Sequence, residues 1–306
     1  MRIKFTKMQG CGNDYVYIDG FKEHIAQDKK SEVVIRLSDR HFGIGSDGVI
    51  FINPSVIADF EMEMYNADGS RAEMCGNGIR CVAKYVYDNG LTDKEQFTIE
   101  SFGKIKYITV ETETEEGAGG CAKKIVKSVT VDMGEPVLKA EDIPVKCEAY
   151  QDGMDAADAH IVGTDAEGRV IAQPITVKGR TFAMTCVSMG NPHAVVFTDT
   201  KDVDIYGPDF ECAPEFPRRV NTEFVHVISR NEVDMRVYER GTGETLACGT
   251  GCCATCVACV LNGLTDREIT VHVLGGDLRI KWDERDGHVY MTGPAAVSFT
   301  GEIDIW

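Results

Sequence analysis

The chain has 306 residues and a formal net charge of −17, and 43% of the residues are hydrophobic. This length suggests one large or two ordinary domains, and the composition is typical of a globular protein. The negative charge argues against nucleic acid or an anionic membrane as the main partner, because like charges repel. No apolar run approaches the roughly 20 residues of a membrane helix, and "MRIKFTKMQG" lacks the apolar segment of a signal peptide. We therefore expect a cytoplasmic protein whose 12 cysteines are free thiols.

The predicted elements of the first half begin with a Gly-Asn turn that leads into a strand, "GNDYVYI" (12–18). An alternating strand, "FEMEMYN" (60–66), precedes a Cys-Gly-x-Gly turn at Cys75. This turn opens a helix, "GIRCVAKYVYDNG" (78–90), which ends at Asn-Gly as helices commonly do. Strand-like segments follow, and we interpret the acidic, Gly-rich "ETETEEGAGG" (111–120) as a hairpin loop.

The second half repeats the order of the first. When the chain is shifted by 173 residues, 61–95 aligns with 234–268 without a gap, and Cys75 falls on Cys248. The second helix is "GCCATCVACVLNG" (251–263), and both helices are followed by the letters "LTD". Self-similarity of this kind indicates a duplication.

The duplication predicts two similar α+β domains related by a pseudo-twofold axis. The boundary between them is expected near "KKIVKSVTVDMGEP" (123–136). We interpret "QDGMDAADAHIVGTDAEGR" (151–169) as a loop or a short insertion in the second domain.

Each Cys-Gly-x-Gly turn combines a thiol with the start of a helix. The N–H groups of a first helical turn lack partners within the helix and, with the helix dipole, bind anions. A cysteine at such a point is in a site known to lower the thiol pKa. We therefore expect Cys75 and Cys248 each to ionise near neutral pH beside a cradle for a carboxylate.

Two bases on opposite sides of one carbon atom suit racemisation or epimerisation. One base removes a proton and the other returns one, so one cysteine must be a thiolate and the other a thiol. Two helix N-termini aimed at the substrate carboxylate would stabilise its enolate-like charge. A pyridoxal-phosphate enzyme would use its cofactor instead, but no lysine here lies in a recognisable context for one. The alternative interpretation is a pair of buried structural cysteines preserved by the duplication.

At these residues the chain resembles diaminopimelate epimerase, and the resemblance runs nearly from end to end. Seven segments resemble the family's motifs in order. They are "KMQGCGNDYVYID" (7–19), "FGIGSDGVI" (42–50), "MYNADGSRAEMCGNGIRC" (64–81), "MGNPHAVVF" (189–197), "RRVNTEFVHV" (218–227), "YERGTGETLACGTG" (238–251) and "MTGPA" (291–295).

The resemblance implies an isomerase without cofactor or metal that interconverts LL- and meso-2,6-diaminopimelate, on the route to lysine and peptidoglycan. It implies an α+β fold of two pseudo-symmetric domains, each a β-barrel-like sheet around a central helix. The domains would be residues 1–128 plus 295–306 and residues 129–294, with the active site in the cleft between them.

The family's catalytic cysteines fall on Cys75, written by convention as the proton donor, and Cys248, written as the acceptor. His193 and Glu239 fall on positions that tune the thiols. The substrate-binding positions implied are Asn13, Asn66, Gly76, Asn77, Asn191, Asn221, Glu239, Arg240, Gly249 and Thr250. Some members bind substrate with a glutamine after "GIGxD", where this sequence has Gly48, so another group must serve.

Several of these residues also have a plainer interpretation. The asparagines could occupy ordinary turns, His193 could be structural, and Arg80 could attract anions or form a structural ion pair. "GIGSDG" (43–48) fits a dinucleotide motif, but a strand follows it where a helix should. Cysteines 253, 256 and 259 superficially resemble an iron–sulfur run, but the fourth cysteine with its proline is absent, so we expect buried packing.

Two other functions remain open from the sequence. A racemase for another amino acid, such as histidine, or a proline racemase-like enzyme would use the same two thiols. A redox-active binding protein would instead join Cys75 and Cys248 in a reversible disulfide. In every case we expect a small-molecule partner, no nucleic acid and no membrane, and the sequence leaves open whether the protein is a homodimer.

Overall fold

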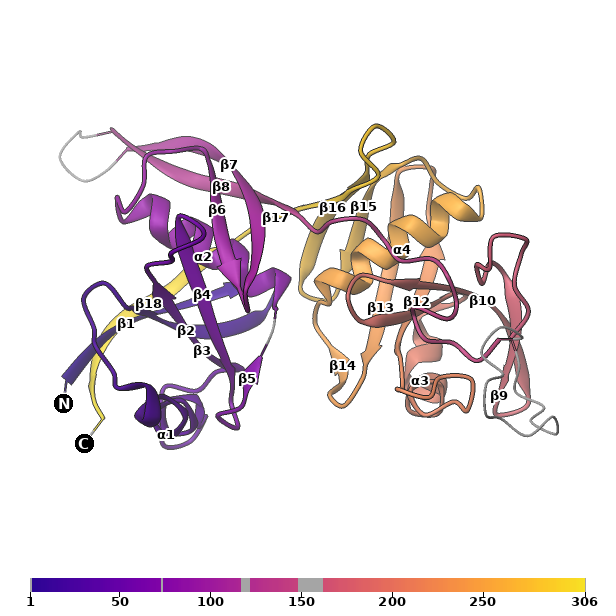
Figure 1. Cartoon of the computed structure of the whole chain (residues 1–306), viewed down its shortest axis with the longest axis horizontal. Helices are drawn as coiled ribbons and strands as arrows, with labels where there is room; N and C mark the ends of the chain where they lie inside the picture. The colour runs from indigo at the N-terminus through magenta and orange to yellow at the C-terminus, as the bar shows by residue number, and fades with distance from the viewer. Residues whose placement is uncertain (1, 73, 117–121, 148–161, 306) are drawn as a thin grey trace. The chain divides into compact units, whose positions relative to one another are not determined.

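The computed structural model describes residues 2–72, 74–116, 122–147 and 162–305. The chain divides into two compact units, the first formed by 1–132 with 292–306 and the second by 133–291 (Figure 1). The first unit therefore ends at Asp132 and resumes at Thr292. Of the predicted insertion, residues 151–161 lie outside the described part of the chain.

The first unit is a mixed sheet with one helix against each of its faces. Its strands are β1 Arg2–Gly10, β2 Asn13–Asp19, β3 Gly48–Asn53, β4 Phe60–Asn66, β5 Arg71–Ala72, β6 Gln96–Ser101, β7 Lys104–Glu116, β8 Ala122–Asp132 and β18 Ala296–Asp304. Its helices are α1 Gln27–Ser38 and α2 Gly76–Asp88. The strands pair in the order β18-β1-β2-β3-β4-β6-β7-β8, with β2–β3 and β4–β6 parallel and the others antiparallel.

The second unit repeats this order of pairing. Its strands are β9 Gln173–Val177, β10 Arg180–Ser188, β11 Pro192–Phe197, β12 Asn221–Val227, β13 Glu232–Glu239, β14 Gly243–Thr245, β15 Glu268–Val273 and β16 Gly276–Trp282, and β17 Val289–Gly293 spans the division between the units. Its helices are η2 Thr200–Asp202, α3 Val203–Glu211 and α4 Gly249–Leu261. The order is β9-β10-β11-β12-β13-β15-β16, with β11–β12 and β13–β15 parallel. The predicted duplication is thus present in the strand pairing.

The helix that follows each cysteine packs inside its own sheet. Helix α2 contacts β1 and β2 and also β7 and β8, which come from opposite ends of the pairing order, so the sheet curves around it. Helix α4 likewise contacts β10, β11 and β12 on one side and β15 and β16 on the other. Both predicted helices are confirmed, and each begins 173 residues from the other, at Gly76 and Gly249.

The other two long helices, α1 and α3, lie on the outer faces and were not assigned from the sequence. Helix α1 contacts β3 and β4, and α3 contacts β12 and β13 (Figure 1). Each connects a pair of parallel strands, because a parallel pair needs a crossover connection. Val33, Val34 and Leu37 of α1 are fully buried against the first sheet. No helix in the described part of the chain is long and apolar enough to cross a membrane.

The hairpin loop predicted over 111–120 is wrong in its first six residues, which belong to β7. Strands β7 and β8 pair from Ile108 and Val131 out to Glu116 and Ala122. Glu115 lies opposite Lys123, and such opposite charges across a ladder are favourable. The acidic composition that suggested a loop is therefore the pattern of an exposed strand.

A buried carboxylate holds α1 against the first sheet. Glu63 on β4 binds Lys30 and Gln27 of α1, Tyr65, and Arg71 of β5. Burial by itself raises the pKa of Glu63, but the hydrogen bonds from Lys30, Gln27 and Tyr65 outweigh it and lower the pKa to about 2.

We predict that Glu63→Gln destabilises the protein at pH 7 by about 3–5 kcal/mol, because the mutation leaves Lys30 buried without its carboxylate. A carboxyl group whose pKa is lowered by folding stabilises the fold at pH values above its pKa in the unfolded chain. This stabilisation is lost as pH falls through its pKa in the folded protein. The difference from wild type should therefore shrink between about pH 4.5 and pH 2, as measured by urea unfolding. The control is Glu32→Gln, whose exposed pair with Lys29 should contribute little. Equal effects of the two variants would contradict the prediction.

Candidate active site

In the first unit, Cys75 forms the N-cap of the buried helix α2. Its backbone is extended (φ −136°, ψ 113°), and its Sγ accepts a hydrogen bond from the N–H of Gly78 at 3.3 Å. An N-cap side chain normally satisfies an N–H of the first turn in this way. The predicted coincidence of a thiol with a helix N-terminus is confirmed, and Gly76 and Asn77 form the first turn.

Asn13 faces this thiol from the neighbouring strand β2. The Cys75 thiol donates to Oδ1 of Asn13 at 3.0 Å, and Nδ2 of Asn13 donates to Asp47 at 2.7 Å. Asp47 in turn accepts from the guanidinium of Arg40 at 2.8 Å. This chain of contacts fixes which end of the Asn13 amide meets the thiol.

Arg80 is fully buried beneath the first turn of α2. It donates to the carbonyl oxygens of Gly76 and Pro294 at 3.1 Å each, and to Oδ1 of Asn77 at 2.9 Å. Arg80 therefore positions the Asn77 side chain and the first turn, a role that sequence analysis did not assign to it. Because its guanidinium already binds these three oxygens, it acts here as a structural support.

The second unit places Cys248 at the equivalent point of α4. Cys248 is extended (φ −114°, ψ 108°), and its Sγ accepts from the N–H of Gly251 at 3.4 Å. The hydroxyl of Thr250 lies 3.5 Å from the sulfur. Gly249 and Thr250 form the first turn, as Gly76 and Asn77 do in α2.

The environment of Cys248 differs from the expected one, because its thiol pKa is raised well above the ordinary value. Burial is the main cause, and the neighbouring carboxylates of Glu239 and Glu223 add to it. The hydrogen bonds from Thr250 and Gly251 favour the thiolate but do not outweigh these effects. The expectation that Cys248 ionises near neutral pH is therefore wrong for this state of the protein. Glu239 and the Cys248 thiol thus act on each other's pKa.

Glu239 lies at the end of β13 and is held by the hydroxyl of Thr245. Burial raises the pKa of Glu239, against the opposing effects of Thr245, His193 and the Cys248 thiol. Glu239 thus acts on the pKa of the Cys248 thiol, whereas His193 acts on the pKa of Glu239. Arg240, beside Glu239, donates instead to the carbonyl of Arg218 at 3.1 Å.

Two of the predicted binding asparagines of unit 2 have clearly different settings. Asn191 is half-buried, and its Oδ1 lies 3.0 Å from Nε2 of the fully buried His193. Asn221 is buried and joins backbone groups, donating to the carbonyl of Pro192 at 2.8 Å and accepting from the N–H of Arg240 at 3.0 Å. Asn221 therefore fixes the turn that carries Arg240.

In the first unit, Asn66 ends β4 and Gly48 begins β3. The two residues are partners in the β3–β4 ladder, and the exposed Asn66 donates to Ser70 at 3.1 Å. A Cβ atom at Gly48 would lie 2.0 Å from the carbonyl oxygen of Tyr65. The local backbone therefore requires glycine, and a glutamine could not stand here unless the strands moved.

Comparison with known proteins identifies the family. A family model described as diaminopimelate epimerase matches residues 5–139 and 185–298. The diaminopimelate epimerase of Agathobacter rectalis is 54% identical to this chain, over 99% of this chain and 100% of the relative. The chain belongs to the diaminopimelate epimerase family. Another relative, the diaminopimelate epimerase of Methanococcus maripaludis strain S2, is 50% identical over 99% of this chain and 100% of its own length.

Solved structures of other proteins share the fold at low sequence identity. A PhzF-family phenazine biosynthesis protein of Bacillus anthracis has a TM-score of 0.67 at 15% identity, with full coverage of both chains. A hydroxyproline epimerase of Agrobacterium vitis has a TM-score of 0.61 at 12% identity, covering 99% of this chain and 91% of that one. These likenesses support the expected class, an α+β fold of two similar units, each with a sheet curved around a helix.

Within each unit, the chain brings most of the predicted site residues of the diaminopimelate epimerase family close to the helix N-terminus. Asp47 and Glu223 belong to these surroundings but were missed. Their signals were available, since Asp47 lies in "GIGSDG" (43–48) and Glu223 is an acidic residue in the strand-like segment "NTEFVHV" (221–227). Asp47 contacts Asn13 and Glu223 contacts His193, and a motif comparison does not reveal such contacts between side chains.

The remaining cysteines of α4 do not form a site. Cysteines 252, 253, 256 and 259 are fully buried, as expected for packing residues. All eleven cysteines of the described ranges are free thiols. The described residues also contain no group of three or more histidine, cysteine or acidic side chains that could hold a metal ion.

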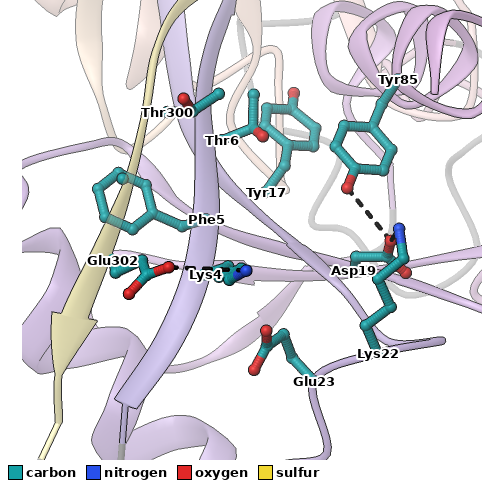
Figure 2. Close-up of a pocket in the computed structure, with 11 residues that line it drawn as sticks. Lys4, Phe5, Thr6, Tyr17, Asp19, Lys22, Glu23, Tyr85, Thr300 and Glu302 are labelled. Atoms are coloured by element: carbon teal, nitrogen blue, oxygen red, sulfur yellow. Dashed lines mark hydrogen bonds and ion pairs between the residues drawn. The ribbon is translucent and has the colours of Figure 1, made fainter.

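A pocket of about 300 Å³ lies elsewhere in the first unit, between β1, β2 and β18 (Figure 2). Four of its charged side chains form two ion pairs. Asp19 accepts from Tyr85 at 3.2 Å and from Lys22 at 2.8 Å, and Lys4 lies 3.6 Å from Glu302. None of the predicted site residues lines this pocket.

We predict that Glu239→Gln lowers the pKa of the Cys248 thiol, because the mutation removes a neighbouring negative charge that disfavours the thiolate. The pH dependence of Cys248 alkylation by iodoacetamide, followed by peptide mass spectrometry, should shift to lower pH. The exposed Cys212 provides the internal control and should keep its profile. An unchanged profile of Cys248, or a shift to higher pH, would contradict the electrostatic role of Glu239.

Proposed function

We propose that this protein interconverts LL- and meso-2,6-diaminopimelate without a cofactor, with Cys75 and Cys248 as the two bases. As a member of the diaminopimelate epimerase family, the chain is an isomerase. One observation carries the assignment of the bases. Each unit presents a thiol as the N-cap of its buried helix, at positions 173 residues apart. The proposed place of the reaction is the route to lysine and peptidoglycan.

In the proposed reaction, the two thiols meet opposite faces of the reacting carbon of the substrate. One cysteine, as thiolate, takes the proton from Cα, and the other, as thiol, gives its proton to the opposite face. The enzyme then holds the same number of protons, with the roles of Cys75 and Cys248 exchanged. Epimerisation in the reverse direction begins from that state.

The first turns of α2 and α4 supply the electrostatic part of the proposal. Their N–H groups have no carbonyl partner within the helix, and the helix dipole favours negative charge at this end. Gly76 with Asn77 and Gly249 with Thr250 are the residues proposed to hold the reacting carboxylate. Its enolate-like charge would be stabilised there as the proton leaves.

Before Cys248 can act as a base, it must lose its proton. Glu239 is a carboxylate that acts on this thiol, and burial raises the pKa of Glu239, so its affinity for a proton is increased. We propose that Glu239 receives the proton of Cys248. The Cys75 thiol instead donates to the neutral amide of Asn13. Asn13 only hydrogen-bonds to its thiol, so the two thiols differ in whether a carboxylate is at hand to take the proton.

Selection of diaminopimelate is the finer part of the proposal. Its distal ammonium and carboxylate need partners, for which we propose Asn66, Asn191, Asn221 and Arg240. A guanidinium suits a carboxylate because it offers two parallel N–H donors. The 54% and 50% identity to relatives named diaminopimelate epimerase favours this substrate over that of another amino-acid racemase.

The setting of the enzyme is also a proposal. The net charge of −17 supports a small-molecule enzyme with no nucleic acid partner, working in the cytoplasm. A homodimer is the oligomeric state to test first, since symmetric pairs are the commonest assemblies of soluble proteins. Light scattering during size-exclusion chromatography would separate a dimer from a monomer.

We predict that Cys75→Ala and Cys248→Ala each reduce epimerisation by about 10²- to 10⁴-fold or more, because each removes one of two bases that must both act. The measurement is deuterium incorporation at Cα of LL- and meso-diaminopimelate in heavy water, beside a panel of other amino acids. Cys212→Ala should retain wild-type activity, because Cys212 is exposed and lies outside the proposed site. Circular dichroism checks that the variants are folded. Substantial turnover by either alanine variant would overturn the two-base proposal.

A further inference from the structure

A buried glutamate and histidine in contact with each other lie directly beneath the first turn of α4. Glu223, in the middle of β12, is 0% exposed, and its Oε1 lies 2.7 Å from Nδ1 of His193, which is also 0% exposed. Its second oxygen, Oε2, has no hydrogen-bond partner within the described ranges. Burying a carboxylate oxygen without a partner is costly, so stability alone does not account for this residue.

The first unit fills the equivalent position with an apolar residue. In the β12–β13 ladder, Glu223 lies opposite Val237, and in the β3–β4 ladder, Ile50 lies opposite Met64. Val237 and Met64 are 173 positions apart, so Glu223 and Ile50 occupy equivalent places in the two units. By the same registers, His193 corresponds to Tyr15. The fold therefore accepts Ile50 with Tyr15 in one unit and uses Glu223 with His193 in the other.

The packing around these equivalent residues is the same. A Cβ atom at Gly78 would lie 2.8 Å from Cδ1 of Ile50, and one at Gly251 would lie 2.6 Å from Oε1 of Glu223. In both units the strand residue thus supports the first turn of the helix. What Glu223 adds is a hydrogen bond to His193, which an isoleucine could not make.

The contact with Glu223 fixes how the His193 ring meets Asn191. Nδ1 of His193 lies 2.7 Å from Oε1 of Glu223, and Nε2 lies 3.0 Å from Oδ1 of Asn191. The Nδ2 end of the Asn191 amide is then turned away from His193. Without Glu223, the ring loses the contact that holds it in this orientation against the Asn191 amide.

We propose that Glu223 is a positioning residue for the reaction proposed above, on which this inference rests. Its carboxylate holds the His193 ring against Oδ1 of Asn191, and so keeps the amide N–H₂ of Asn191 directed to the substrate. Glu223 does not touch the reacting atoms. Its effect on substrate binding passes through two side chains, His193 of β11 and Asn191 of the turn before β11.

The test is a double-mutant cycle on the full chain with LL-diaminopimelate, followed by deuterium incorporation. Glu223→Ile installs the residue that the first unit carries, and Asn191→Ala removes the side chain through which it should act. Each should raise KM by about 10- to 100-fold, as loss of an orienting partner commonly does. The positioning role is read from KM alone, because Glu223→Ile also removes a carboxylate that raises the pKa of the Cys248 thiol, and kcat changes with it.

Two further results are expected if Glu223 acts through Asn191. The variant with both mutations should have the KM of Asn191→Ala alone, since the second mutation has nothing left to misplace. Glu223→Gln, which keeps a hydrogen-bonding group beside His193, should restore most of the lost affinity. If the two mutations together raise KM by the product of their separate effects, the inference is overturned. The inference is also overturned if Glu223→Ile lowers the fraction of active protein but leaves KM at the wild-type value, because that is the result expected of a purely structural role.

Should Glu223→Ile fail to fold, the variant carrying both His193→Tyr and Glu223→Ile takes its place. It installs the whole pair found at Tyr15 and Ile50, and the same rise in KM is expected. If the wild-type protein exchanges no Cα proton of diaminopimelate, the proposed function fails, and this inference fails with it. An active wild type with independent effects of the two mutations overturns the role of Glu223 alone.

Discussion

The close approach of a helix's first turn to the strand beneath it is the constraint on which each half of the site depends. At Gly78 and Gly251 there is no room for a side chain, because Ile50 and Glu223 occupy the space. This contact lets the N–H groups of these glycines reach back to the sulfur atoms of Cys75 and Cys248. The cysteine is thereby fixed as the N-cap, at the end of the helix where negative charge is favoured.

The same scaffold produces two different thiols. Cys75 is half-buried and donates to an amide, whereas Cys248 is buried beside two carboxylates. The helix N-terminus is common to both, so it cannot by itself decide the ionisation of either. For Cys248, burial and the carboxylates raise the thiol pKa despite the helix. A two-base reaction needs one thiol and one thiolate, and unequal surroundings are a physical means of keeping them distinct.

The duplication explains why this asymmetry could arise without loss of the fold. The strand order and the parallel crossovers are repeated, and α1 and α3 occupy corresponding places on the outer faces. Exchange of Ile50 and Tyr15 for Glu223 and His193 alters only the side chains beneath the inner helix. Polar supports of this kind, like Asp47 beneath Asn13 and Arg80 beneath Asn77, hold the groups proposed to meet the substrate.

The sequence by itself determined the duplication, the bounds of the two inner helices to within a few residues, and the place of both cysteines at their N-termini. The helices and their caps are local features, since a turn, a cap and a periodic pattern lie within about 30 consecutive residues, and the duplication needs only a comparison of the sequence with itself. The tertiary structure decided the outer helices, the full length of β7, the need for glycine at Gly48 and the protonation of Cys248. It also revealed Glu223, whose neighbours His193 and Gly251 lie about 30 positions away on either side. Burial and electrostatic contact depend on residues that only the folded sheet brings together, and for that reason no local pattern could have predicted them.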